Sequence, residues 1–216
     1  MVTAVKIDMK RELGDLYAAP RHPELVDVPP LRYLMIDGAA AEGATGPADD
    51  PGFRAAVGEL YSLSYTLKFE MKERGEDYVV MPLEGLFWTH GSDEFRPGGP
   101  APTRWTLMIL QPPHVTPLQV ADAGVRLLER GKLERPPRAR LETLREGRAA
   151  HVLHLGPYAQ EAPTIERLHA FIDELGLTRR GKHHEIYLSD PNRTAPERLK
   201  TVIRQPVSPR ETVDEP

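Results

Sequence analysis

Cysteine is absent from the 216-residue chain, which excludes disulfide bonds, thiolate nucleophiles, thiolate metal sites and iron–sulfur clusters. The sequence also lacks an apolar run that approaches the roughly 20 residues needed to span a bilayer. Its N-terminus, Met1 to Asp8, has neither the basic start nor the apolar core of a signal peptide. We therefore expect a cytoplasmic protein that has no membrane partner.

An excess of charge of one sign is missing as well. The 28 basic and 32 acidic side chains leave a formal net charge of −4, which argues against nucleic acid as the main partner. With 40% hydrophobic and 28% charged residues, the composition is that of a folded globular protein rather than a disordered one. The length suits one large domain or two small ones, and it leaves monomer and homodimer equally open.

Several common catalytic and nucleotide-binding motifs do not occur. There is no phosphate-binding G-x-x-x-x-G-K-[ST], no G-x-G-x-x-G after a strand, and no G-x-S-x-G nucleophile elbow. The run His183-His184-Glu185 has the composition of a metal cluster, but adjacent strand residues point to opposite faces. Only His183 and Glu185 could therefore share an ion, and the spacing suggests no third ligand. We expect neither a metal nor a cofactor.

Proline is abundant, with 22 residues, and together with glycine it divides the chain into short elements. A helix is predicted from Asp50-Pro51 to Gly75, and a capping box at Thr116–Gln119 predicts a second helix to about Arg130. The remaining expected elements are strands at 31–38, 78–88 (interrupted at Pro82), 104–110, 151–156, 182–188 and 199–204, a weaker strand at 140–144, a helix at 165–175, a short helix after a second capping box at 194–197, an extended lead-in at 20–30, and loops at 39–50 and 93–102.

The order of these elements repeats, since each half of the chain is predicted as strand, helix, strand, strand. The half-repeats span about 33–112 and 150–206, and the helix at about 117–130 links them. Three markers recur: a glycine after the first strand (Gly38, Gly156), an acid in the second (Glu84, Glu185), and Gln-Pro after the third (Gln111-Pro112, Gln205-Pro206). We expect one α+β domain over 1–207, in which duplicated β-α-β-β units form a pseudo-symmetric curved sheet with helices on one face and a ligand cleft on the other, followed by a flexible tail at 208–216.

Side chains alternate along a strand, so Glu185 and Tyr187 face away from their apolar neighbours and toward the expected cleft. If the repeat holds, Glu84 looks into the same cleft, to which Trp88 and Trp105 add aromatic surface. Flat apolar ligands stack on such rings, and a carboxylate among them can pair with a cation or act as a general base. The alternatives are a solvated surface glutamate and tryptophans that simply pack in the core. Core packing also accounts for Tyr61 and Tyr65, which lie one helical turn apart.

Several runs resemble the stand-alone GyrI-like small-molecule-binding proteins. They are Gly181 to Pro191 with its His-His-Glu-Ile-Tyr-Leu block, Thr194 to Thr201, Asp77 to Trp88, Ser64 to Phe69 and His154 to Tyr158, and the similarity extends from about Lys6 to Val207. The resemblance implies a duplicated β-α-β-β fold with a cleft for flat, hydrophobic, often cationic molecules and an acidic residue at its floor. Some members are the sensor half of multidrug-responsive transcription regulators, but no DNA-binding helical domain fits before Tyr33.

Stand-alone members hydrolyse the strained cyclopropane of DNA-alkylating, duocarmycin-like cyclopropanoids, and the resemblance therefore implies a hydrolase that protects against such compounds. Glu185 matches the cleft acid and is the expected general base, while Tyr187 or Tyr158 would donate a proton to the developing phenolate. The expected ligand contacts are Glu84, Trp88, Trp105, Phe87, Leu86, Tyr65 and His183. Two departures from the family pattern affect the cleft rim: a longer loop at 39–50, and Phe87 where a second tryptophan is common.

Two other functions remain open. An aromatic cleft with an acid could bind and sequester multiple drugs without catalysing anything. Binding to a protein partner such as gyrase has less support, because no long apolar stripe is left over.

Overall fold

The computed structural model describes residues 6–40, 50–89, 91, 95 and 103–210. The sheet has nine strands: β1 (Glu24–Val28), β2 (Leu31–Ala39), β3 (Leu83–Thr89), β4 (Thr103–Leu110), β5 (Arg140–Leu144), β6 (Gly147–Leu155), β7 (Leu177–Arg179), β8 (His183–Tyr187) and β9 (Lys200–Pro209). The helices are α1 (Met9–Glu12), α2 (Gly14–Tyr17), α3 (Pro51–Glu73), α4 (Pro117–Glu129) and α5 (Ala162–Glu174), with 3₁₀ turns η2 (Tyr158–Gln160) and η3 (Pro196–Arg198). The loops predicted at 39–50 and 93–102 lie mostly outside the described residues.

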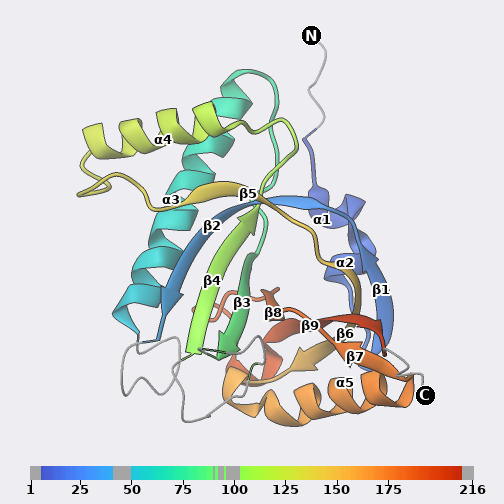
Figure 1. Cartoon of the computed structure of the whole chain (residues 1–216). Helices are drawn as coiled ribbons and strands as arrows, with labels where there is room; N and C mark the ends of the chain where they lie inside the picture. The colour runs from blue at the N-terminus through green and yellow to red at the C-terminus, as the bar shows by residue number, and fades with distance from the viewer. Residues whose placement is uncertain (1–5, 41–49, 90, 92–94, 96–102, 211–216) are drawn as a thin grey trace.

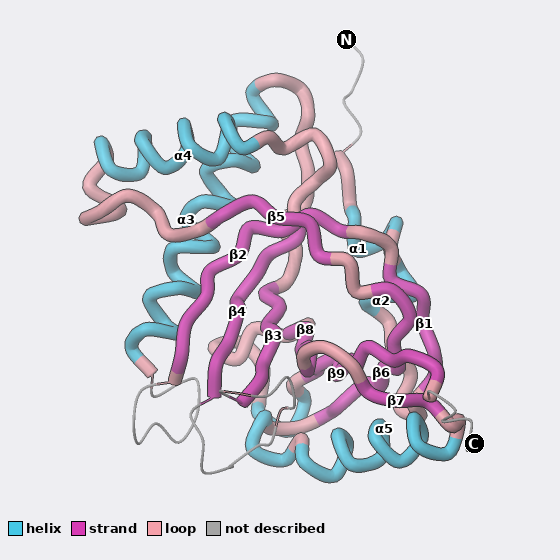
Figure 2. Tube along the Cα trace, in the orientation of Figure 1, coloured by secondary structure: helices cyan, strands magenta, loops and turns pink. Residues whose placement is uncertain are grey.

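The strands form one antiparallel, curved sheet in the order β1-β6-β9-β8-β3-β4-β2-β5, and β7 pairs with the far end of β9 (Figures 1 and 2). The order is palindromic, because β6-β9-β8 of the second half meets β3-β4-β2 of the first at the β8–β3 pair. This arrangement confirms the α+β class and has the form expected of duplicated β-α-β-β units. None of the described helices is long and apolar enough to cross a membrane.

Helices α3 and α5 cover the same face of the sheet. Asp50 caps α3, as predicted, by accepting hydrogen bonds from the backbone of Gly52 and Phe53. The ring of Phe53 then meets that of Trp105 on β4 edge to face at 5.4 Å. In the second half, α5 buries Ile165, Leu168 and Ile172 against strand residues that include Val152 and Ile203. Figure 1 shows α3 along β2 and β4, with α5 below the other half of the sheet.

Strand register shows which of the three sequence markers are equivalent. Gly38 pairs with Trp105, six positions before Gln111, and the Gly156 amide bonds to Leu199, six positions before Gln205. Glu84 pairs with a residue three positions before the first glutamine, whereas Glu185 pairs with one two positions before the second. The glycines and the Gln-Pro pairs are therefore equivalent, but the glutamates are one residue out of step.

That single residue puts Glu84 and Glu185 on opposite faces of the sheet, because side chains alternate along a strand. Across the β3–β8 junction Glu84 lies opposite Ile186, and Glu185 lies opposite Gly85. Glu185 also lies opposite Ile203, whose side chain packs against α5. The expectation that both acids look into one cleft is wrong, and so is the expectation that Glu185 faces away from the helices.

Three local predictions also need correction. The lead-in at 20–30 contains β1, an edge strand that pairs only with β6. Prolines on either side of β1 are tolerated there, because an edge strand has no second neighbour that needs their missing backbone N–H. The second capping box does not form, because η3 is one 3₁₀ turn that starts after Ala195 and has no side-chain cap. Ser208 and Pro209, expected in a flexible tail, belong to β9 and pair with β7; residues 211–216 of the predicted tail lie outside the described residues.

A buried ionic cluster joins the two halves on the face opposite α3 and α5. His184 of β8 bonds through Nε2 to Glu84 of β3 at 3.0 Å and through Nδ1 to Glu146 at 2.9 Å. Glu146 also accepts from Arg204 of β9 at 3.1 Å. All four side chains are buried, so the two acids and two bases balance inside the protein.

The N-terminal segment covers this cluster and adds two hydrogen bonds to it, although Nε of Arg204 keeps no partner among the described residues. The hydroxyl of Tyr17 donates to Glu84 at 2.6 Å, and Arg204 donates to the backbone oxygen of Leu16 at 2.7 Å. The pKa values of two members of the cluster are shifted in opposite directions. Burial alone would lower the pKa of His184, but the Glu146 and Glu84 carboxylates raise it to about 9. Burial alone would raise the pKa of Glu146, but His184 and Arg204 lower it to about 2.

Replacing Glu146 should lower the stability of the protein, because His184 and Arg204 lose the acid that pairs with both of them. We expect Glu146→Gln to lower the free energy of unfolding by about 3–5 kcal/mol in urea titrations, and Glu174→Gln on the exposed side of α5 to change it little. The lowered pKa of Glu146 means that its contribution is present above about 4.5 and is lost as pH falls through about 2. The raised pKa of His184 means that its contribution is present below 6.5 and is lost as pH rises through about 9. A variant that unfolds like the wild type at every pH would contradict the role given to this cluster.

Candidate functional site

Glu185 lies at the centre of a polar and aromatic group on the helix-covered face, which we call the Glu185 cluster (His183, Glu185, Tyr187, Tyr158 and Glu161). One carboxylate oxygen accepts from Nε2 of His183 at 3.0 Å, and the other accepts from the hydroxyl of Tyr187 at 2.7 Å. The period of two along β8 brings these three side chains together, because they occupy alternate positions of one strand. Two hydrogen bonds thus fix the orientation of the carboxylate.

On the β3 side of Glu185, an aromatic ring takes the place of a directly opposed side chain. The residue directly across from Glu185 is Gly85, and the ring of Phe87 lies over it, since an added Cβ would meet that ring at 2.6 Å. Phe95 stacks on His183 with ring centroids 4.6 Å apart and contacts Phe87 at 5.8 Å. A row of rings therefore borders the carboxylate at this end.

Tyr158, in the turn before α5, is the tyrosine of the cluster that reaches the surface. Its ring meets that of Tyr187 edge to face at 5.4 Å, and 36% of its surface is exposed. Burial, followed by the charges of Glu161 and Glu185, raises the pKa of Tyr158 to about 12. Burial and Glu185 also raise the pKa of Tyr187. Both hydroxyls therefore keep their protons at neutral pH, and that of Tyr187 is already committed to Glu185.

Glu161 is a second acid at this site, and the sequence analysis did not identify it. It occupies the N-cap position of α5, yet its side chain makes no capping hydrogen bond. The side chain is buried, and one of its oxygens has no hydrogen-bond partner among the described residues. Burial, together with the charge on Glu185, raises the pKa of Glu161 to about 9. At neutral pH Glu161 thus keeps its proton beside Glu185.

Two further residues expected at the ligand share the helix-covered face but are buried. Phe87 contributes to the row of rings and is 4% exposed. Trp105 lies one strand farther on and packs between Phe53 and the backbone of Gly38, where an added Cβ would meet the indole at 2.1 Å. Trp105 is therefore a core residue that holds α3 on the sheet, and the expectation that it adds aromatic surface to the cleft is wrong.

Glu84, Leu86 and Trp88 project from the opposite face of the sheet, for the reason given by the register. Glu84 belongs to the ionic cluster and Leu86 is buried. The Nζ of Lys182 sits 3.5 Å from the centroid of the Trp88 ring, in a cation–π contact. These three side chains do not join the Glu185 cluster.

Tyr65 is neither in the core nor in the cluster. It is 47% exposed on α3 and stacks between Tyr61 and Phe69, with centroid distances of 6.2 and 6.3 Å. Tyr61 is partly buried, and burial raises its pKa. Among the described residues, no three His, Asp or Glu side chains are placed to hold a metal ion together.

Comparison with known proteins agrees with this architecture. Residues 116–208 match the model of the GyrI-like small-molecule-binding domain. The crystal structure of an uncharacterized conserved protein from Listeria innocua is 34% identical, with a TM-score of 0.83 over 94% of this chain and 100% of that one. Two structures described as hydrolases from the same organism are 34% and 32% identical, with TM-scores of 0.77 and 0.80 and the same coverage. No protein of curated function matches significantly.

The fold and these similarities define a duplicated α+β domain that binds small molecules. The chain belongs to the GyrI-like family of small-molecule-binding domains. The C-terminal domain of EcmrR, at 12% identity and a TM-score of 0.50 over 87% of this chain and 98% of that one, shares the fold alone.

Glu161 should reduce stability in the unliganded protein, because the fold buries its carboxyl group without full compensation. Its raised pKa means that its contribution is most favourable below about 4.5 and becomes unfavourable as pH rises through about 9. We expect Glu161→Gln to raise the free energy of unfolding at pH 8 by about 1–2 kcal/mol and to have no effect at pH 4. Glu166→Gln, an exposed acid on the same helix, is the matched control. Loss of stability in Glu161→Gln at pH 8 would show that Glu161 is a structural residue.

Proposed function

We propose that the Glu185 cluster binds flat, hydrophobic small molecules and that the protein hydrolyses electrophilic ones, with carbonyl-conjugated cyclopropanes of the duocarmycin type as the substrate class. One observation carries the proposal: the buried carboxyl group of Glu161, whose pKa is raised to about 9 by burial and by Glu185, lies beside Glu185, whose two oxygens are fixed by His183 and Tyr187. When the surroundings of two neighbouring carboxyl groups give them different pKa values, the group that keeps its proton can act as a general acid and the other as a general base. The aromatic side chains around them suit a flat ligand.

The reaction needs one base and one acid. Glu185 takes a proton from water while the water oxygen bonds to the less hindered cyclopropane carbon. The carbon–carbon bond of the ring breaks, and its electron pair moves through the conjugated system to the carbonyl oxygen. Glu161 protonates that oxygen, so the product is the ring-opened phenol, equal to substrate plus one water, and proton return through solvent restores both acids. In this scheme Tyr187 and His183 position Glu185, and Tyr158 borders the ligand.

Two further facts support hydrolysis. The similar Listeria innocua proteins described as hydrolases match over the whole of their length. A strained ring also supplies driving force, so the barrier reduction asked of one acid and one base is modest, roughly 5–8 kcal/mol together. On this proposal the protein protects its cell from genotoxic alkylators by destroying them.

Sequestration without turnover is the second candidate, and the hydrogen bonds of Glu185 favour it. Both oxygens of that carboxylate are already engaged, by His183 and by Tyr187, which suits a fixed anionic anchor for a cationic ligand. The same aromatic side chains would then hold a range of drugs, as in a multidrug-binding protein.

Turnover separates these two functions. With a spirocyclopropyl dienone at about 100-fold excess over protein, a hydrolase converts the whole pool to a product one water heavier, whereas a sequestering protein protects about one equivalent. We expect Glu185→Gln and Glu161→Gln each to lower the rate by about 10²–10⁴-fold, and Glu166→Gln to retain it. Mass spectrometry and the absorbance of the new phenol provide the measurement.

Binding is measured on the same variants with one neutral and one cationic aromatic ligand. For a general base, Glu185→Gln leaves the affinity of the neutral ligand almost unchanged while hydrolysis is lost. For an anionic anchor, it weakens the cationic ligand by about 1–3 kcal/mol and the neutral one hardly at all. Recovery of all the unreacted dienone from a saturated wild-type protein would rule out the hydrolase.

A further inference from the structure

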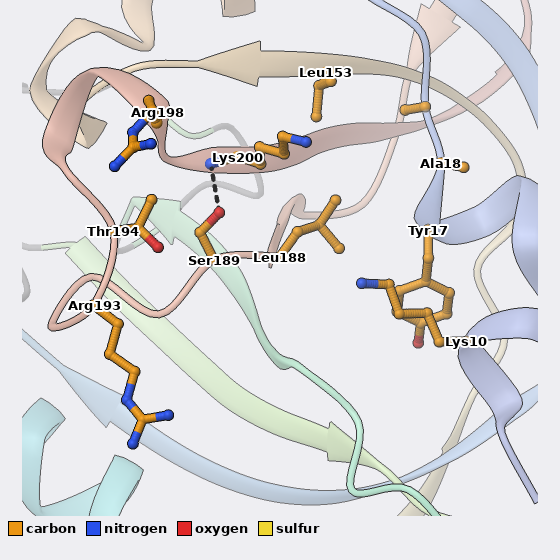
Figure 3. A pocket seen from close by; sticks show the side chains of 11 residues that line it. Lys10, Tyr17, Ala18, Leu153, Leu188, Ser189, Arg193, Thr194, Arg198 and Lys200 are labelled. Atoms are coloured by element: carbon orange, nitrogen blue, oxygen red, sulfur yellow. Dashed lines mark hydrogen bonds between the residues drawn. The ribbon is translucent and has the colours of Figure 1, made fainter.

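A second binding surface lies on the face opposite Glu185. A hollow of about 720 Å³ opens between α2, the edge of β6 and the loop from Leu188 to Lys200. In Figure 3, Lys200 and Leu188 lie between the loop that carries Arg198 and Thr194 and the segment that carries Tyr17 and Lys10. Leu153 of β6 is on the same face as Ile186 and Glu84, since all three are joined through paired strand positions. The sheet therefore separates this hollow from the Glu185 cluster.

The charged side chains that line the hollow are all cationic: Lys10, Arg193, Arg198 and Lys200. Among the described residues, only one ion pair involves any of them, between Arg193 and Asp190 at 3.7 Å, and the Arg193 side chain is 84% exposed. Such an exposed pair contributes little. Four like charges around one hollow repel one another, in a chain whose formal net charge is −4. Bound negative charge would relieve that repulsion.

The loop that brings these cations together has a defined conformation. The backbone of Leu188 donates to Lys200, and the Lys200 backbone in turn donates to the hydroxyl of Ser189 at 3.1 Å. A turn at Asp190 closes through the backbone amide of Thr194. The backbone that carries Arg193, Arg198 and Lys200 is therefore fixed at one end of the hollow before any ligand arrives, which lowers the entropic cost of binding.

The other walls are apolar. Leu153, Leu188, Ala18 and Ala19 line the hollow together with the ring of Tyr17. A volume of about 720 Å³ is in the range of pockets for drug-sized molecules. We propose that this hollow binds an amphipathic organic anion, with a carboxylate, sulfonate or phosphate group against Arg198 and Lys200, its apolar body on Leu153 and Leu188, and Lys10 on the facing wall (Figure 3). This site is independent of the Glu185 cluster and takes ligands of the opposite charge.

The test uses two dyes that differ in charge. The anionic probe is 8-anilinonaphthalene-1-sulfonate, and N-phenyl-1-naphthylamine is the same ring system without the sulfonate. We expect the sulfonate to bind the wild-type protein at one site and to weaken about tenfold in Arg198→Gln/Lys200→Gln, since each exposed charge contributes a few-fold. Lys10→Gln, on the opposite wall, should weaken it by about two- to fivefold. Raising the salt concentration from about 50 mM to about 500 mM should weaken it further.

The matched control is Arg130→Gln/Lys132→Gln, which removes one arginine and one lysine from an exposed turn that does not line the hollow. This variant should bind the sulfonate within about twofold of the wild type, and the uncharged dye should bind the Arg198→Gln/Lys200→Gln variant as it binds the wild type. Glu185→Gln should leave sulfonate binding unchanged, which separates this result from that of the proposed hydrolase. The proposal is overturned if the wild type does not bind the sulfonate, if the hollow and control variants weaken it equally, or if Glu185→Gln abolishes it.

Discussion

The antiparallel register between β3 and β8 decides which side chains of the two halves share a face. Glu84 lies opposite Ile186 and Glu185 opposite Gly85, so the two acids project from different sides of one continuous sheet. A slip of one residue would move every side chain of a strand to the other face. The ionic cluster opposes such a slip, because His184 bonds to Glu84 across the same junction. The two faces can therefore have different chemistry although the halves have the same topology.

The two faces treat buried charge differently. On one, Glu84 and Glu146 are paired with His184 and Arg204, and these pairs hold the two halves together. On the other, Glu161 has no such cation, and its protonated form is favoured instead. Glu84 has a cationic partner and Glu161 has none among the described residues, which is why Glu161 and not Glu84 belongs to the candidate reaction site.

Much of the fold follows from the sequence, because the signals involved are local. Asp50-Pro51 and the Thr116–Gln119 capping box start helices as predicted, and both capping hydrogen bonds of the box are present. The glycine and Gln-Pro markers identify the repeat correctly. The acid marker is wrong. Glu84 and Glu185 differ by one position in register, and a difference of one position moves a strand side chain to the other face of the sheet. Glu161 could not be recognised, because its role depends on burial and on the charge of a residue 24 positions away, and no local pattern records either.

The duplication also explains how Glu161 becomes available. The N-cap of α3 is Asp50, whose short side chain bonds back to the first turn of its own helix at 2.8 Å. The equivalent place before α5 is held by Glu161, whose longer side chain leaves the helix uncapped. The register puts Leu83 where the other half has Glu185, so the first half has no acid at that position of the sheet. One half of the repeat therefore keeps its helix cap and an apolar side chain at this strand position, while the other gives up a capping bond and holds two acids close together. On the proposed function, the half whose strand β8 carries His183, Glu185 and Tyr187 is thus the one in which stability is given up for activity.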